Sequence, residues 1–355
     1  MIALAEVLRR HWPAYEKKFG AALLPSHRRA VACILACRTP ALGGQLFCCP
    51  KCGQAHYAYH SCNHRACPQC GAADATEWIT RRKLKLLPVP YYLITFTVPE
   101  ELRGWLRSHQ QLGYTLLLRE SAGALQDVAG REKYLGGALG ILSVLHTWGR
   151  QLQFHPHVHC VVPAGALRKD GLRWVRPTAL DFFLPYPVLA ARFRNRLRNL
   201  LRTEHPDEFR QIPAAVWRQA WVVNVQPAGS GEGALKYLSA YVYRTALGNH
   251  RILADEHGHV TFRYQDSEDR QWHTLTLLAF EFLRRFLQHI LPSGFQRVRY
   301  YGWLSGAATA KWERILALLD WRAPAPALSA PPAPPVCPQC GAPLRLVGTL
   351  ARAPP

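Results

Sequence analysis

Two short cysteine motifs constrain the fold of this chain more than any other feature. Residues 49–53 read CPKCG and residues 67–71 read CPQCG, with fourteen residues between Cys52 and Cys67. The Cys-Pro-x-Cys-Gly sequence is typical of a tight turn that directs two sulfurs at one ion, and its glycine tolerates a positive φ. Two such turns supply four thiolates, the tetrahedral set that zinc prefers. The sequence therefore predicts one structural Zn²⁺ bound by Cys49, Cys52, Cys67 and Cys70.

The remaining cysteines leave alternatives open. Cys62, His60 and His64 lie between the two motifs and could replace a ligand or hold a second ion, but we favour positions that support the ligands or face DNA. Cys33, Cys37 and Cys48 are interpreted as packing residues. A third motif, CPQCG at 337–341, has no second pair beside it. It is either half of a zinc site that another chain or domain completes, or a remnant.

Composition narrows the class of protein. The 355 residues carry a net charge of +21, and 49% of them are hydrophobic. A charge excess of this size indicates a polyanionic partner, either nucleic acid or an anionic membrane surface. No apolar run is long enough to span a membrane, the first residues do not resemble a signal peptide, and no P-loop motif is present. Cysteines in a chain without an export signal favour metal sites over disulfides.

The pattern of hydrophobic residues predicts mixed helices and strands without a regular βαβ alternation, which indicates an α+β fold. Expected helices lie within 1–45, 76–87, most of 100–150, 187–203, 232–247 and 278–291; expected strands are 91–98, 154–163, 219–226, 258–264 and 273–277. We expect a helical and zinc-binding domain at 1–88 and a catalytic domain at 89–320. A Pro/Ala-rich linker should cover 321–336, followed by a CPxCG tail at 337–355.

A strand rich in histidine is the second strong signal. Residues 154–163 read FHPHVHCVVP, so His155, His157 and His159 fall on one face of the expected strand. Same-face side chains two residues apart are ~7 Å apart and can converge on one cation. The opposite face, beginning at Val158, should pack into the core. The pattern predicts a second metal site.

Two tyrosines are the third signal. Tyr237 and Tyr241 are four residues apart on an expected helix, so they share one face. Such a pair alone most often serves packing. A phenol, with a pKa near ~10, is a weak nucleophile at neutral pH, but it can attack a phosphate whose charge a nearby divalent cation withdraws. A phosphotyrosine would store the bond energy, so rejoining would need no ATP.

These motifs carry a family resemblance. His157-Val158-His159 resembles the His-hydrophobe-His motif of single-strand ("HUH") endonucleases, and most of the chain closely resembles the two-tyrosine rolling-circle transposases of the insertion-sequence-91 family. The similar blocks follow in order, and they are the cysteine segment, LHTWGRQLQFHPHVHCVVPAGAL (145–167), LKYLSAYVYRTALGNHRI (235–252), VTFRYQD (260–266) and FLRRFLQHILPSGFQRVRYYGWL (282–304).

The resemblance implies a fold, an activity and partners. The fold would be a central antiparallel sheet flanked by helices, with the histidines on a middle strand and the tyrosine helix beside it. His157 and His159 would bind catalytic Mg²⁺ or Mn²⁺, and Tyr237 and Tyr241 would cut single-stranded DNA at the element ends and target, leaving a 5′-phosphotyrosine. Host replication factors or a helicase would be further partners, no membrane would be involved, and the protein would act in the bacterial cytoplasm at the nucleoid.

The third ligand of that metal stays open among His155, Glu232 and Gln153. Mg²⁺ prefers oxygen ligands, so a carboxylate, an amide or the substrate phosphate would complete the site. Three basic clusters favour DNA, and each could also be a solvated face. They begin at Arg81, Arg192 and Arg284. Two alternative functions remain: a replication initiator or relaxase with the same chemistry, which should lack the block at 282–304, or a zinc-containing DNA-binding regulator without catalysis.

Overall fold

The computed structural model describes residues 2–70, 72–179, 182–243, 246–266, 268–322, 324–325 and 334–352. The chain forms two compact units. The first contains Met1–Asp74, Tyr243–Ile290 and Pro326–Pro355, and the second contains Ala75–Val242 and Leu291–Ala325. Each unit is made of several segments of the sequence. The domains expected from the sequence are instead continuous stretches, and they remain a prediction about which parts fold independently.

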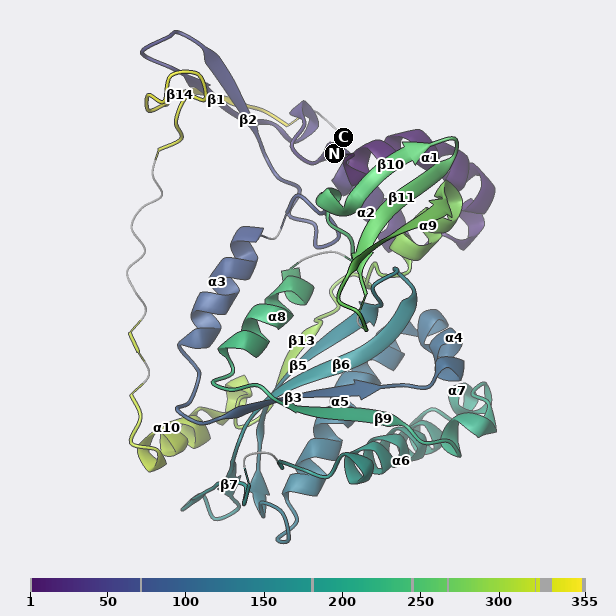
Figure 1. Ribbon diagram of the computed structural model, residues 1–355, viewed down its shortest axis with the longest axis vertical. Helices are drawn as coiled ribbons and strands as arrows, with labels where there is room; N and C mark the ends of the chain where they lie inside the picture. The colour runs from purple at the N-terminus through teal and green to yellow at the C-terminus, as the bar shows by residue number, and fades with distance from the viewer. Residues whose placement is uncertain are drawn as a thin grey trace. The chain divides into compact units, whose positions relative to one another are not determined.

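The first unit combines helices with two small antiparallel sheets (Figure 1). One sheet has the order β14-β1-β2 and the other β10-β11-β12. The elements are α1 (Leu4–Phe19), η1 (Gly20–Ala22), α2 (Pro25–Ala36), η2 (Pro40–Leu42), β1 (Gly44–Cys48), β2 (Ala55–Tyr59), η4 (Asn249–Arg251), β10 (Ile252–Glu256), β11 (His259–Gln265), β12 (Trp272–Leu278), α9 (Ala279–Leu287) and β14 (Arg345–Leu350). Strands β1, β2, β10 and β14 were not expected from the sequence.

A buried carboxylate ties α1 to β10. The Asp255 side chain is 1% exposed and accepts hydrogen bonds or ion pairs from Arg10, at 2.9 Å, and from His11 Nε2, at 2.7 Å. A buried charge is costly unless it is paired, so these two partners are what allow Asp255 to lie inside. The contact joins the beginning of the chain to residues about 245 positions later.

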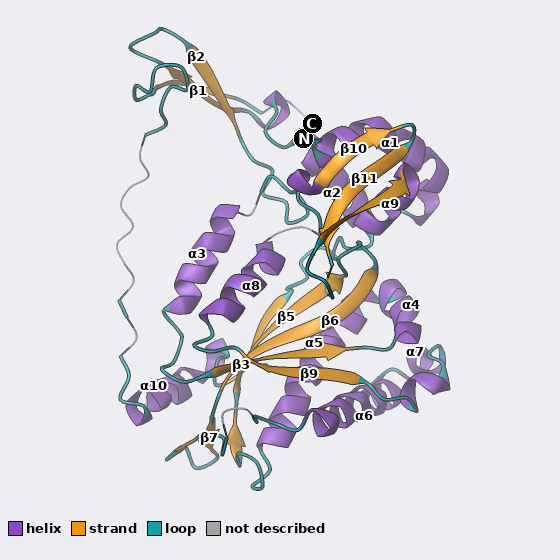
Figure 2. Cartoon of the chain, viewed as in Figure 1, coloured by secondary structure: helices purple, strands orange, loops and turns teal. Residues whose placement is uncertain are grey.

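The second unit is built on a five-stranded sheet with the order β13-β5-β6-β3-β9, in which every neighbouring pair is antiparallel (Figure 2). Its elements are α3 (Ala72–Lys83), which begins at the boundary, β3 (Tyr91–Thr97), α4 (Glu100–Ser108), α5 (Gln110–Ala129), β4 (Gly137–Ala138), β5 (Gly140–Trp148), β6 (Phe154–Pro163), β7 (Ala166–Arg168), β8 (Trp174–Val175), α6 (Tyr186–Glu204), α7 (Pro206–Arg210), η3 (Ala214–Trp217), β9 (Val222–Pro227), α8 (Glu232–Tyr243), β13 (Val298–Gly302), η5 (Gly306–Ala308) and α10 (Thr309–Leu318).

This sheet confirms the expected α+β class with a central antiparallel sheet, and it places the histidine strand β6 in the middle. The two faces of β6 differ, as the period of two residues requires. Val158, Cys160 and Val162 belong to the main hydrophobic core together with side chains of α5 and α6. Each fully buried large apolar side chain contributes ~1.5–3 kcal/mol, so this one-sided packing fixes the strand's register and leaves the histidines on the opposite face.

One sequence expectation for the second unit was only partly right. The segment 100–150 was expected to be mostly helical; α4 and α5 confirm this as far as Ala129, but residues 140–148 form β5. Strand β5 lies inside the sheet and eight of its nine residues are buried, so its mainly apolar sequence does not alternate with polar residues. A short apolar run of this kind does not distinguish a buried strand from a buried helix by periodicity.

Most of the Pro/Ala-rich stretch 321–336 lies outside the described residues, and so its expected role as a linker is not described by the structure. Within the part of the chain that is described, no helix combines the length and apolar character that crossing a bilayer requires.

Candidate functional site

Three histidines of the second unit converge on the face of the sheet opposite the main core. His157 and His159 lie on β6, and His146 is paired directly with His157 across the neighbouring strand β5. The Nε2 atom of His157 is 2.8 Å from His146 Nδ1 and 3.1 Å from His159 Nε2. One nitrogen from each ring lies within 4.8 Å of the others, and all three side chains are buried. This spacing is suited to one metal ion.

Hydrogen bonds on the far side of two rings direct their Nε2 atoms toward the centre of the cluster. His157 Nδ1 is 2.7 Å from the carbonyl oxygen of His155, and a carbonyl can only accept, so Nδ1 donates and Nε2 keeps its lone pair. Thr95 Oγ1 is 2.9 Å from His159 Nδ1 and can hold that ring in the same tautomer. Ligand histidines in metalloproteins are commonly fixed by such partners on the other nitrogen.

The protonation state also suits metal binding. Burial lowers the pKa of His157 to about 3, and burial likewise lowers the pKa of His159 to about 4. Both rings are therefore neutral at physiological pH. Neutral imidazole is the form that coordinates a metal, so no proton has to leave these two side chains when an ion binds.

Helix α8 brings a tyrosine to this cluster. The Tyr237 ring meets the His159 ring edge-on, with 5.7 Å between centroids and an interplanar angle of 86°. Tyr237 is 43% exposed, so part of this residue is open to a large substrate. Tyr241 follows on the same helix, but its side chain lies outside the described residues.

The structure brings a different third histidine to the cluster than the sequence reasoning named. Of the three candidates, Glu232 is paired with Lys83 at 2.6 Å, and Gln153 Oε1 accepts a hydrogen bond from the backbone of Gln151. The His155 ring is tilted by 51° against that of His157, with 5.1 Å between the centroids, and His155 does not belong to the group of three. His146 was missed because its strand was expected to be helical. The signal that could have found it is the LHTW sequence, a histidine inside an apolar run.

The cysteines form two clusters, which corrects the expectation of one four-thiolate site. Cys67 and Cys70 lie with Cys37 and Cys62, and Cys49 and Cys52 lie with the C-terminal pair Cys337 and Cys340. The two N-terminal motifs therefore do not share one ion, because each is closed by cysteines from elsewhere in the first unit. Cys37, interpreted as packing, and Cys62 are both brought within ligand distance.

The Cys37 cluster has the dimensions of a zinc site. The Cys70 sulfur is 3.5 Å from that of Cys37 and 3.7 Å from that of Cys62. A tetrahedron with Zn–S bonds of ~2.3 Å has sulfurs about 3.8 Å apart, so these contacts fit. A hydrogen bond from the Cys67 thiol lowers the pKa of Cys62 to about 5, whereas burial raises the pKa of Cys37 to about 11 and the bond to Cys62 raises that of Cys67. Zinc binding to this cluster would therefore release the protons of Cys37 and Cys67.

Each of the three basic clusters contains charges that are paired with carboxylates. Arg192 and Arg196 bind Asp127, and Arg196 also binds Glu120, whose side chain is only 2% exposed. Arg284 and Arg285 both bind Glu281. These arginines serve the fold at least in part. On α3, Arg81 binds Glu77 and Lys83 binds Glu232; Lys85, two residues after the end of this helix, is exposed and lines a cavity of the second unit.

Known proteins resemble the chain along most of its length. The family described as "Transposase zinc-binding domain" matches residues 7–98, and the family described as "Putative transposase" matches residues 140–311. The chain is 36% identical over 349 residues to "Putative transposase y4qJ" of Sinorhizobium fredii (strain NBRC 101917 / NGR234), covering 93% of this chain and 87% of that protein. It is 29% identical over 312 residues to "Transposase for insertion sequence element IS801" of Pseudomonas savastanoi pv. phaseolicola, covering 82% and 74%.

These matches define the class of protein as a transposase. More particularly, the chain belongs to the insertion-sequence-91 family of transposases, with a zinc-binding domain ahead of the transposase domain. The sequence resemblance is thereby confirmed, and Zn²⁺ is the metal of the cysteine-rich first unit.

A solved structure with partial similarity is the "Conjugative Relaxase TrwC in complex with OriT Dna", described as metal-free. It is 12% identical, and the alignment covers 65% of this chain and 72% of that one with a TM-score of 0.24. A score this low carries no argument about this chain.

Proposed function

We propose that this transposase cuts and rejoins single-stranded DNA with a tyrosine nucleophile, in the manner of rolling-circle transposition. The observation that carries the proposal is the contact between Tyr237 and the three-histidine cluster. A nucleophile at the edge of a buried metal-binding group is the arrangement that phosphoryl transfer needs. The net charge of +21 supports a polyanionic substrate.

The histidines would hold a divalent cation, Mg²⁺ or Mn²⁺, which when bound withdraws charge from the scissile phosphate. The residues present fit such an ion because they offer three convergent ring nitrogens, and burial keeps the rings of His157 and His159 neutral. Both ions prefer oxygen ligands, so water and phosphate oxygens would have to complete the shell. His155 does not bind the ion in this proposal; its backbone carbonyl accepts a hydrogen bond from His157 Nδ1 and so fixes the ring of His157.

In the cutting step, one phosphate ester bond of the DNA is replaced by a phosphate ester bond to the protein. The Tyr237 hydroxyl loses its proton and its oxygen bonds to phosphorus, while the bond from phosphorus to the 3′ oxygen breaks. That oxygen takes up a proton and leaves as a 3′ hydroxyl, and the protein keeps a 5′-phosphotyrosine. Attack of a second 3′ hydroxyl on the phosphotyrosine reverses these bonds, so joining needs no ATP.

Tyr241 is the second nucleophile in this proposal. It lies one helical turn after Tyr237 on α8, which is the spacing that puts both positions on one face of the helix. Two tyrosines allow a second strand to be cut before the first is released. DNA ends of the element and its target are the substrates, in the bacterial cytoplasm at the nucleoid, with host replication factors or a helicase supplying single strands.

The test is a cleavage assay on labelled single-stranded DNA that carries the sequences flanking the coding region. Wild type, Tyr237→Phe, Tyr241→Phe, the double variant and His157→Ala are compared with and without added Mn²⁺. Tyr243→Phe is the matched control, because helical periodicity places position 243 off the face shared by 237 and 241. Zinc is left in place throughout, so that the first unit stays folded.

We expect a covalent protein–DNA adduct that needs added metal, is lost in the double variant and in His157→Ala, and persists in Tyr243→Phe. Tight DNA binding without any adduct would contradict the proposal and support the non-catalytic regulator. An adduct that survives the double Tyr→Phe variant would mean that another residue is the nucleophile.

A further inference from the structure

The C-terminal CPQCG motif joins the N-terminal zinc module. The Cys49 sulfur is 3.4 Å from that of Cys340, and the Cys52 sulfur is 3.7 Å from that of Cys337 and 3.8 Å from that of Cys340. These distances agree with the ~3.8 Å edge of a tetrahedral four-thiolate zinc site and are far longer than the ~2.05 Å of a disulfide. The matched zinc-binding family ends at residue 98, so it does not include the C-terminal pair.

The two motifs have the same backbone conformation, as two halves of one zinc ribbon should. In the first, Gly53 donates its N–H to the carbonyl of Cys49 at 2.9 Å; in the second, Gly341 donates to Cys337 at 2.8 Å. Both glycines adopt the left-handed conformation, with φ of 71° and 70°. Each turn therefore directs its pair of sulfurs in the same way.

Strand pairing gives independent support. Strand β14, which follows the C-terminal motif, pairs antiparallel with β1 from Gly44↔Leu350 to Cys48↔Arg345. Figure 1 shows yellow β14 beside β1 at the opposite end of the colour scale. Without β14, β1 would have β2 as its only neighbour in this sheet and would become an exposed edge.

We propose that Cys49, Cys52, Cys337 and Cys340 bind a second structural Zn²⁺, which makes the C-terminus an integral strand of the N-terminal zinc module. His56, whose Nε2 is 3.4 Å from the Cys337 sulfur, supports this site by donating a hydrogen bond to the thiolate. The chain is then closed by the ion over 288 positions between Cys52 and Cys340.

The test counts zinc in the whole chain by native mass spectrometry. His157→Ala/His159→Ala serves as the background, so that the histidine cluster adds no ion. We expect two zinc ions in this background, one after Cys337→Ser, and two after Cys48→Ser, a matched control whose thiol is adjacent to Cys49 but outside the cluster. Hydrogen exchange of residues 44–48 should become at least tenfold faster in Cys337→Ser alone.

A single zinc in the parent, or two zinc ions after Cys337→Ser, would overturn the proposal. If Cys337→Ser does not yield folded protein, Cys340→His replaces it, because histidine is also a zinc ligand, and this variant should retain two zinc ions. The number of zinc ions in the His157→Ala/His159→Ala parent then tests the proposal by itself.

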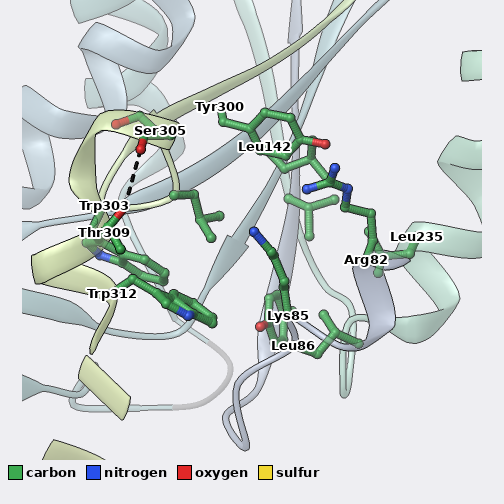
Figure 3. Close-up of a pocket in the computed structure, with 14 residues that line it drawn as sticks. Arg82, Lys85, Leu86, Leu142, Leu235, Tyr300, Trp303, Ser305, Thr309 and Trp312 are labelled. Atoms are coloured by element: carbon green, nitrogen blue, oxygen red, sulfur yellow. Dashed lines mark hydrogen bonds between the residues drawn. The ribbon is translucent and has the colours of Figure 1, made fainter. Parts of the chain in front are cut away.

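A cavity in the second unit supports a separate inference. It has a volume of about 180 Å³ and is walled by aromatic and basic side chains (Figure 3). The walls that matter here are Arg82, Lys85, Tyr300, Trp303 and Trp312. Figure 3 shows the Lys85 ammonium group projecting between the tryptophans and the Arg82–Tyr300 pair, in which the guanidinium lies 4.6 Å from the ring centroid.

The floor of this cavity continues the sheet face that carries the histidines. Val161 is two residues beyond His159 on β6 and so lies on the same face, ~7 Å further along. Leu142 pairs with Val161, and Tyr300 pairs with Leu142, so the three form one row across the sheet. Leu235, two residues before Tyr237, lines the same cavity.

We infer that this cavity holds the unpaired base next to the phosphate that is cut, an inference that rests on the proposed function. Trp312 and Tyr300 offer ring faces for stacking, and Arg82 and Lys85 offer positive charge to the adjoining phosphate. Trp303, only 1% exposed, forms the back wall. A DNA strand with its scissile phosphate at the histidines would have its neighbouring nucleotide over this row.

The test measures binding of single-stranded DNA in which the nucleotide next to the cut site is intact or abasic. We expect the abasic change to weaken binding by about tenfold or more in wild type, from the stacking free energy of one base, and by much less in Trp312→Ala. Trp272→Ala, an exposed tryptophan of the first unit, is the control and should behave as wild type.

An equal abasic effect in wild type and in Trp312→Ala would overturn the inference while leaving the adduct assay positive. Absence of any adduct would instead count against the proposed function itself, so the two failures are distinguishable.

Discussion

The histidine cluster and the cysteine clusters each bring several possible metal ligands together, but the ligands lie at different separations along the chain. His146, His157 and His159 come from two adjacent strands, within fourteen positions of one another. One cysteine cluster spans only 33 positions, from Cys37 to Cys70, whereas the other joins residues 291 positions apart. The histidine site is fixed by the register of one antiparallel pair, whereas this second cysteine cluster requires two distant segments of the chain to meet. The face on which a strand residue lies can be predicted from the alternation of residue types along the strand. A contact between distant segments leaves no such pattern in the sequence.

The two kinds of site also differ in what holds them in the absence of metal. The histidines are supported by the main hydrophobic core on the other side of β6, so the sheet should persist without an ion. The cysteines lie among short strands and turns with little apolar burial, and there the ion itself contributes much of the folding free energy. Removing a ligand should therefore damage structure in the first unit and activity in the second.

The largest effect is expected from Cys37→Ser. Structural zinc contributes roughly 10–16 kcal/mol of apparent binding free energy in small zinc domains, so loss of one of four ligands should lower the stability of the first unit by several kcal/mol. The measurement is zinc content together with urea denaturation. Cys33→Ser is the matched control on the same helix, because Cys33 lies outside both clusters. Unchanged zinc content in Cys37→Ser would contradict the assignment.

A large effect on rate, with little effect on folding, is expected from His159→Ala. Loss of a supporting partner of a metal ligand typically costs 10–100-fold, so loss of a ligand should lower single-turnover cleavage by more than about 100-fold. The circular dichroism spectrum should remain that of wild type. If the His159→Ala variant were unfolded at room temperature, the sheet of the second unit would depend on this histidine for its folding, contrary to the difference between the units stated above.

A smaller effect is expected from Thr95→Val. The change removes the hydroxyl that lies 2.9 Å from His159 Nδ1 and keeps the shape of the side chain. Metal affinity, measured as the Mn²⁺ concentration for half-maximal cleavage, should weaken by about 10–100-fold. Thr95→Ser keeps the hydroxyl and should restore most of the affinity; if it does not, the hydrogen bond is not what positions the ring.

The smallest effect concerns pH. The pKa of His157 is lowered to about 3 and that of His159 to about 4, below the ~6.5 of an unfolded chain. Below pH ~6.5 the unfolded chain therefore binds protons that the folded chain does not, so stability is lost as the pH falls towards 4. At pH 6 the loss is about 0.8 kcal/mol per histidine.

The check is urea denaturation of wild type and of His157→Gln/His159→Gln between pH 7 and 5, without added Mg²⁺ or Mn²⁺. The wild type should lose stability more steeply than the variant as the pH falls. Parallel curves would mean that the two histidines are not buried as neutral groups.

The sequence predicted much of the second unit because its signals are local. Strands 91–98 and 154–163 alternate or carry β-branched and aromatic runs, and both appear as β3 and β6. His157 and His159 share a face because of the strand's period of two residues. The expected helix at 140–148 was wrong, because β5 is buried on both faces and its residues do not alternate between polar and apolar. His146 lies on this strand and was therefore missed.

The sequence by itself determined the residue types: paired cysteines in glycine turns, histidines at alternate positions of a strand, tyrosines one helical turn apart, and an excess of positive charge. Only the tertiary structure decided which cysteines share an ion and which third histidine completes the cluster. The physical reason is that a CPxCG turn fixes the direction of two sulfurs but not their partners. Partner choice depends on the pairing of β1 with β14 and on the end of α2, and those contacts exist only after segments far apart in the chain have packed together.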